Sequence, residues 1–126
     1  MIKKQDRRLR VGVLGCGPIA QFAHLQSCAK AANADLYAIC DAAPDLLARM
    51  GATYEPRKMY ADYDAMLGDP ELEAVIVATS DAYHVPMSIK ALDAGKHVLC
   101  EKPIGTSVEE GEALAAAVKR SGKVLQ

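Results

Sequence analysis

Two glycines and an alanine have the spacing that proteins use to hold a pyrophosphate. Gly15, Gly17 and Ala20 follow an apolar run and occupy the small positions of a G-x-G-x-x-A pattern. The first glycine permits a tight turn, the second lets the backbone approach a pyrophosphate, and the third small residue lets a helix pack close to a strand. Pro18 favours the first turn of that helix, whose free N–H groups and positive dipole end attract an anion. The pattern therefore predicts a phosphate-binding turn.

The distance of Asp41 from the glycine turn along the sequence suggests that it also binds part of the ligand. It follows the run Ala34–Cys40, about twenty residues beyond the glycine turn, where a carboxylate can accept both ribose hydroxyls of an adenosine. Its charge would repel a 2′-phosphate, and Ala42 and Ala43 offer no arginine to attract one, which favours NAD over NADP. The alternative is that Asp41 is a surface turn residue that caps the next helix.

Lys102 is the residue with the clearest capacity for catalysis. It stands between Glu101 and Pro103, directly after the run His97–Cys100. An ammonium there can hydrogen-bond a substrate hydroxyl or carbonyl and favour the alkoxide-like charge that develops in hydride transfer. The alternative is a surface ion pair with Glu101, which would contribute little to stability.

His84 could face a dinucleotide from a helix N-terminus or serve only as a structural cap.

The elements that position these residues alternate between strand and helix. We expect strands over 11–14, 34–40, 74–78, 97–100 and 123–126, and helices over 18–32, 44–50, 62–67 and 84–94. A capping box at Thr106 or Ser107 predicts a last helix that ends near Ser121. Ile19, Phe22, Ala23 and Ala29 are expected on the buried face of the first helix. Gly51 should end the second in the left-handed conformation, and Thr53–Tyr54 could be a short strand.

This alternation predicts an α/β fold with a doubly wound parallel sheet. The run 74–78 is apolar at every position, as in a central strand that is covered on both faces. Ligands of such sheets bind beyond the carboxyl ends of the strands. Four of these ends carry the informative residues: Gly15 and Gly17, Asp41, Thr79 with His84, and Glu101 with Lys102. Their convergence on one edge is the main functional indication.

Composition indicates one domain over residues 1–126. Half of the chain is apolar, a quarter is charged and the net charge is −1, which gives no reason to expect nucleic acid or a membrane as a partner. The four cysteines lack C-x-x-C spacing, as in a reduced cytoplasmic protein, and no metal-ligand cluster is apparent. The basic residues Lys3, Lys4, Arg7, Arg8 and Arg10 form an expected solvated leader, and the apolar segment before Cys16 is too short for a signal peptide.

Several motifs together resemble one family. They are Gly15–Ala20, the Cys40–Asp41 strand end, Thr79 with His84 five residues later, and the block Ala94–Pro103. From Arg10 onward the chain is similar to the glucose–fructose oxidoreductase, inositol dehydrogenase and rhizopine catabolism family (Gfo/Idh/MocA). The resemblance implies a Rossmann domain of an NAD(P)-dependent dehydrogenase that acts on a hydroxyl or carbonyl of a sugar, cyclitol or related compound.

The resemblance also implies roles for individual residues. It places Gly15, Gly17, Pro18 and Ile19 at the pyrophosphate, Asp41 at the ribose, Thr79 and His84 beside the cofactor, Glu101 near the nicotinamide, and Lys102 as the active-site lysine. Members often have a cis peptide bond before the proline that corresponds to Pro103.

One departure from the family concerns length. Members are more than twice as long, and a second, largely β domain supplies their substrate pocket. We therefore expect this chain to bind NAD but to turn over little by itself. A non-catalytic dinucleotide-binding or interaction module, and a methyltransferase with a similar glycine turn, are the alternatives. The uncovered last strand suggests a homo-oligomer.

Overall fold

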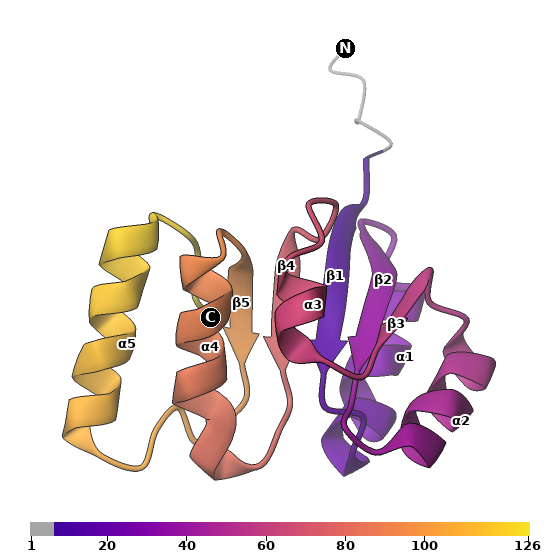
Figure 1. Cartoon of the computed structure of the whole chain (residues 1–126). Coiled ribbons are helices and arrows are strands. Elements are labelled where there is room, and N and C mark those ends of the chain that lie inside the picture. Colours follow the sequence, from indigo (N-terminus) through magenta and orange to yellow (C-terminus); the bar gives the residue numbers. More distant parts are fainter. Residues whose placement is uncertain (1–6) are drawn as a thin grey trace.

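A five-stranded, all-parallel sheet forms the centre of the computed structural model, which describes residues 7–126 (Figure 1). Lys3 and Lys4 of the expected basic leader lie outside the described residues. The strands are β1 (Leu9–Leu14), β2 (Ala34–Cys40), β3 (Lys58–Tyr60), β4 (Ala74–Val77) and β5 (His97–Cys100), in the spatial order β3-β2-β1-β4-β5. The order reverses between β1 and β4, so the predicted doubly wound α/β fold is confirmed.

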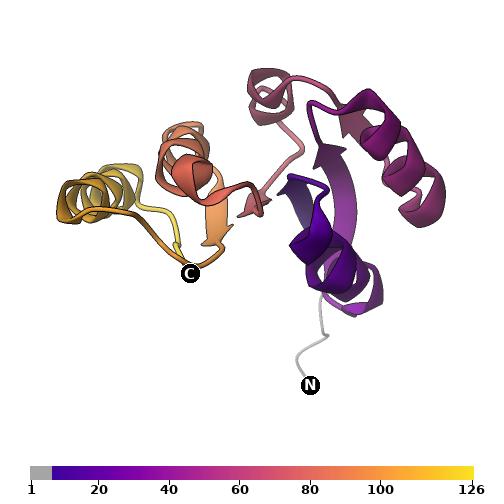
Figure 2. The same ribbon diagram turned by 90° about the horizontal axis from the view of Figure 1, so that it is seen from below.

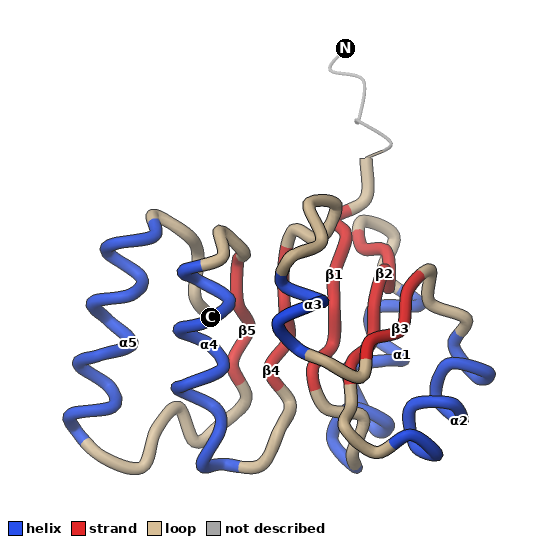
Figure 3. Tube along the Cα trace, in the orientation of Figure 1, coloured by secondary structure: helices blue, strands red, loops and turns tan. Residues whose placement is uncertain are grey.

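The helices cover the two faces of the sheet in separate groups, as Figures 2 and 3 show. Helices α3 (Tyr63–Leu67), α4 (His84–Asp93) and α5 (Val108–Ser121) pack on one face. Helix α2 (Pro44–Tyr54) packs on the other face, together with α1 (Leu25–Lys30) and the π-helical turn η1 (Ala20–His24) that precedes it. A short 3₁₀ turn, η2 (Asp81–Tyr83), leads into α4. All four residues of β4 are buried, as expected for a central strand.

The expected burial of the first helix was wrong. Phe22 is 83% exposed, whereas Ala20, Leu25 and Cys28 provide the buried face. The regular α-helical period that was assumed does not hold here, because the helix opens with a π-helical turn that has more residues per turn. Positions assigned with a 3.6-residue period are therefore rotated out of place.

The expected end of the second helix was also wrong. Helix α2 continues through Gly51 to Tyr54, and the left-handed residue that follows it is Glu55, with φ of 49°. A Cβ atom on Gly51 would lie 2.1 Å from the Met59 sulfur, so this glycine makes room for the neighbouring strand. The third strand is accordingly Lys58–Tyr60, because Thr53 and Tyr54 still belong to the helix.

Capping residues fix the starts of α3 and α5 where the sequence predicts them. The Asp62 carboxylate accepts a hydrogen bond from the Ala65 N–H at 3.1 Å, and the Ser107 hydroxyl accepts one from the Glu110 N–H at 3.2 Å. Gly122 ends α5 with φ of 67°. The expected strand 123–126 is reduced to a parallel bridge between Leu125 and Val98.

Candidate functional site

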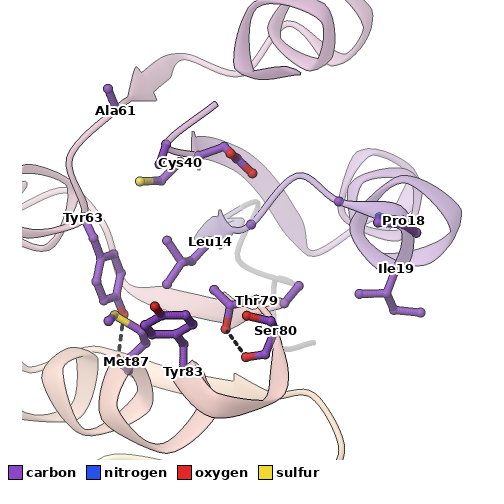
Figure 4. Close-up of a pocket in the computed structure, with 15 residues that line it drawn as sticks. Leu14, Pro18, Ile19, Cys40, Ala61, Tyr63, Thr79, Ser80, Tyr83 and Met87 are labelled. Atoms are coloured by element: carbon purple, nitrogen blue, oxygen red, sulfur yellow. Dashed lines mark hydrogen bonds between the residues drawn. The ribbon is translucent and has the colours of Figure 1, made fainter. Parts of the chain in front are cut away.

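A cleft of about 560 Å³ lies at the carboxyl edge of the sheet, where the strand order reverses. Figure 4 shows side chains that converge on it from the ends of β1, β2 and β4 and from the segments that follow them. The lining residues that the sequence predicted are Gly15, Gly17, Pro18, Ile19, Asp41 and Thr79. The structure therefore brings together residues that are up to 64 positions apart, from Gly15 to Thr79, in one concave site.

The two glycines of the turn meet different constraints. Gly15 has φ of +91°, and a Cβ atom there would lie 2.7 Å from the Ala78 carbonyl oxygen. Its N–H donates a hydrogen bond to the Cys40 carbonyl at 2.9 Å. A Cβ atom on Gly17, in contrast, would meet no atom within 4 Å. Gly15 is therefore required by the fold, while the bare backbone at Gly17 leaves open space along the cleft.

Asp41 is held rigidly beside this turn. Its Oδ2 atom accepts a hydrogen bond from the Cys16 N–H at 2.8 Å, and its Oδ1 atom accepts one from the Ala43 N–H at 2.8 Å. Each carboxylate oxygen keeps a lone pair for a further donor, such as a ribose hydroxyl. Asp41 is not the N-cap of α2, because Ala43 holds that position, but its bond to the Ala43 N–H is a local turn contact of the kind that the alternative describes.

Four of the other lining residues were not indicated by any sequence pattern. Tyr63 donates its phenolic hydrogen to the Met87 carbonyl at 2.8 Å, and Ala61 and Tyr83 also line the cleft (Figure 4). These residues come from α3, α4 and the segments before them, which pack beside the strand ends only in the folded chain. No local motif marks them, so sequence patterns could not have identified this apolar end.

His84 lies behind the cleft and does not line it. The residue is 1% exposed, and its ring has Nδ1 at 2.7 Å from the Pro103 carbonyl and Nε2 at 2.9 Å from the Thr79 carbonyl. The sequence predicted that this ring would contact a dinucleotide directly. In the structure both ring nitrogens face protein carbonyls instead. His84 instead connects the end of β4 to the segment after β5.

Glu101 and Lys102 are also outside the lining of the cleft, in the segment that follows β5. The Glu101 Oε1 atom lies 2.6 Å from the His24 Nε2 atom, and its Oε2 atom accepts a hydrogen bond from the Lys102 N–H at 3.1 Å. The hydrogen bond from His24 is the largest influence that holds the pKa of Glu101 below its ordinary value. The Lys102 side chain is exposed, and the Lys102–Pro103 peptide bond is cis, as the resemblance implied.

Thiol and metal chemistry receive no support within residues 7–126. Burial, followed by the charge of Asp41, raises the pKa of the Cys16 thiol to about 12, so this thiol stays neutral beside the turn. In these residues no three histidine, cysteine, aspartate or glutamate side chains gather closely enough to hold a metal ion. None of the helices described is long and apolar enough to cross a bilayer.

Comparison with known proteins supports the dinucleotide interpretation of the cleft. Residues 9–126 match the Gfo/Idh/MocA family model, described as an oxidoreductase family with an NAD-binding Rossmann fold. The chain is 32% identical over 117 residues to a myo-inositol 2-dehydrogenase of Thermotoga maritima, and the match covers 93% of this chain and 35% of that protein. The chain thus spans about a third of the length of this relative.

Two solved structures have closely similar folds. A WlbA dehydrogenase from Chromobacterium violaceum, in complex with NADH and UDP-GlcNAcA, superposes with a TM-score of 0.90 at 32% identity, over 96% of this chain and 35% of that one. KijD10, a 3-ketoreductase from Actinomadura kijaniata in complex with NADP, gives a TM-score of 0.89 at 31% identity, over 94% and 38%. With the family match over nearly its whole length, this chain belongs to the Gfo/Idh/MocA oxidoreductases and forms their NAD-binding Rossmann domain.

Proposed function

We propose that this chain is the cofactor domain of a dehydrogenase that transfers hydride between NAD and a hydroxyl or carbonyl of a sugar, a cyclitol or a related compound. One observation carries the proposal. Open backbone at Gly17 and the pinned carboxylate of Asp41 face the same cleft at the reversal point of the sheet. That combination fits a pyrophosphate and a ribose side by side.

The lining residues suggest how a dinucleotide would lie. The pyrophosphate fits beside the backbone of Gly17, Pro18 and Ile19, where the first helical turn begins. The adenosine ribose fits at Asp41, and the apolar side chains near Tyr63 and Met87 suit the adenine. The nicotinamide half then extends past Thr79 toward Lys102. In this arrangement His84 supports the cofactor site indirectly, through the carbonyls that its ring contacts.

Asp41 is the residue that we expect to select NAD over NADP. Its two backbone hydrogen bonds prevent the carboxylate from turning away from the ribose. A 2′-phosphate would meet this fixed negative charge, and the exposed Ala42 and Ala43 provide no cation to offset the repulsion. Relatives of similar fold bind NADH or NADP, so the preference depends on this local arrangement.

Lys102 is the proposed catalytic residue. Bound NAD supplies a hydride acceptor at the nicotinamide ring. An ammonium beside the reacting carbon can hydrogen-bond the substrate oxygen and stabilise the negative charge on it. Glu101 is proposed to act beside the nicotinamide through its hydrogen bond to the Lys102 backbone. The sugar or cyclitol substrate is inferred from relatives such as the myo-inositol 2-dehydrogenase.

Titration calorimetry of the chain with NAD and NADP tests this function. We expect NAD to bind more tightly, and at a hundred times its dissociation constant to stabilise the fold by roughly 2.7 kcal/mol. Asp41→Asn removes the charge and should weaken NAD binding about tenfold while it narrows the gap to NADP. Asp93→Asn, which breaks an exposed ion pair with Arg120, is the control and should leave both affinities unchanged.

The outcomes separate this function from the alternatives. Binding of S-adenosylmethionine in place of NAD would support a methyltransferase, and binding of neither would contradict the proposal. Tight NAD binding by a protein of family length that oxidises no sugar or cyclitol would support a non-catalytic module. Sedimentation would test the proposed homo-oligomer.

A further inference from the structure

The strongest unassigned feature is a polar pair that joins the first helix to the segment carrying Lys102. His24 ends the π-helical turn η1, and Glu101 directly follows β5, 77 positions later in the chain. Their side chains meet at 2.6 Å and are only 13% and 19% exposed. A pair so shielded from water is screened less than a surface ion pair. It can therefore hold two elements in a fixed relation.

The Glu101 carboxylate makes two contacts at once. One oxygen faces the His24 ring, and the other accepts the hydrogen bond from the Lys102 N–H at 3.1 Å. The Glu101 N–H in turn donates to the Val77 carbonyl at the end of β4, at 3.1 Å. The backbone at Lys102 is thus tied through a single carboxylate to the first helix.

The first helix is itself tied to the glycine turn. The Gln21 side chain donates a hydrogen bond to the Cys16 carbonyl at 2.8 Å, and the Gln21 N–H donates to the Gly17 carbonyl at 3.1 Å. His24 lies on this same π-helical turn. Single π-helical turns are rare and occur frequently at functional sites. A continuous set of contacts therefore runs from the glycine turn, through His24 and Glu101, to Lys102.

We infer that His24 is a positioning residue, which acts through Glu101 to hold the Lys102 segment in register with the nicotinamide half of a dinucleotide bound at the glycine turn. The inference rests on the proposed function. His24 does not line the cleft, and its Nε2 atom faces the Glu101 carboxylate. Its effect is transmitted by the hydrogen bond to Glu101.

The test compares two ligands that differ only in the nicotinamide half. NAD and ADP-ribose share the adenosine and the pyrophosphate, but ADP-ribose lacks the nicotinamide ring. His24→Leu removes the ring donor at similar volume, and we expect it to weaken NAD binding about tenfold and ADP-ribose binding less than twofold. His24→Gln retains a side-chain N–H at the same reach and should restore most of the NAD affinity. Glu101→Gln, a second variant, should reproduce the selective loss without change at His24.

The controls separate positioning from general stability. Asp93→Asn breaks an exposed charge pair between α4 and α5, far from the cleft lining, and should change neither affinity. Equal losses for NAD and ADP-ribose in His24→Leu, no loss for either, or failure of His24→Gln to restore binding would overturn the inference. If the unmodified chain binds neither ligand, it is the proposed function that fails.

Discussion

An aspartate and a lysine lie at the amino ends of the strands and again at their carboxyl ends, and the protein engages the two pairs to different extents. Asp69 and Lys96 lie before β4 and β5, where the Lys96 ammonium donates to the Asp69 and Leu72 carbonyls, both at 2.9 Å. Asp41 and Lys102 follow β2 and β5, beside open backbone and solvent. The first lysine is 7% exposed and the second is exposed.

The Asp69 carboxylate is as fully engaged as the lysine beside it. It accepts hydrogen bonds from the hydroxyls of Tyr37 and Tyr60, at 2.8 and 2.7 Å, and from the Glu71 N–H at 2.9 Å. These donors hold the pKa of Asp69 below its ordinary value, although burial opposes them. Such an arrangement stabilises the fold and engages three lone pairs of the Asp69 carboxylate, compared with two in Asp41. Identical residue types thus have different roles, which are determined by whether the protein already satisfies their hydrogen bonds.

The largest expected effect follows from loss of the buried ammonium. Lys96→Met keeps the length of the side chain but leaves two buried carbonyls without their donor, and should lower the free energy of unfolding by roughly 2–4 kcal/mol. Urea denaturation measures this loss. Lys119→Met, at an exposed position of α5, should stay within about 0.5 kcal/mol of the unmodified chain. Similar values for both variants would show that the Lys96 ammonium contributes no more to stability than an exposed lysine does.

The two turn glycines provide a comparison within the cleft. Gly15→Ala places a Cβ atom 2.7 Å from a backbone oxygen at φ of +91°, and should lower stability by about 1–3 kcal/mol. Gly17→Ala meets no protein atom and should leave stability nearly unchanged while it weakens NAD binding about tenfold. Thermal unfolding and calorimetry on the same samples separate the two effects. A stability loss for Gly17→Ala equal to that of Gly15→Ala would refute the assignment.

A smaller effect concerns how stability depends on pH through Tyr37, which donates a hydrogen bond to Asp69. Burial and the hydrogen bond to Asp69 raise the pKa of Tyr37 from 10.0 to about 12. Because the folded chain keeps this proton at pH values where the unfolded chain loses it, the associated stability is present below pH 10 and is lost as the pH rises toward 12. Tyr37→Phe should lower stability by about 1 kcal/mol at neutral pH and reduce the alkaline loss. Denaturation midpoints across this pH range provide the measurement, and an unchanged alkaline slope would count against it.

The smallest effect on stability is expected at Lys102, in the segment that follows β5. Lys102→Ala removes an exposed side chain and should change the free energy of unfolding by less than about 0.5 kcal/mol. Its effect should appear only as lost turnover in a protein of family length. A stability loss comparable to that of Lys96→Met would show that both lysines are structural.

Several features of the site were predictable from sequence because each depends on local chemistry. A glycine turn, a strand-end carboxylate and a helix cap are encoded within a few residues, and Gly15, Gly17, Asp41 and Thr79 all line the cleft as expected. The family motif around Lys102 also correctly implied the cis bond before Pro103.

Other features depended on contacts that no local pattern encodes. Phe22 faces solvent because the helix begins with a π-helical turn, and Gly51 lies within a helix, where the absence of a side chain makes room for Met59 of the next strand. His84 and Glu101 were expected beside the cofactor, but their side chains are engaged with protein groups.

The alternation of apolar strands and capped helices by itself determined the sheet, its parallel direction and the edge at which ligands bind, because hydrophobic periodicity and capping act over short distances. Only the tertiary structure decided which polar groups remain available there. A polar group can bind a ligand only where no protein group already occupies it. His24 lies beside Glu101, and Lys96 beside the turn at Asp69, because helices and strands far apart in the chain pack together.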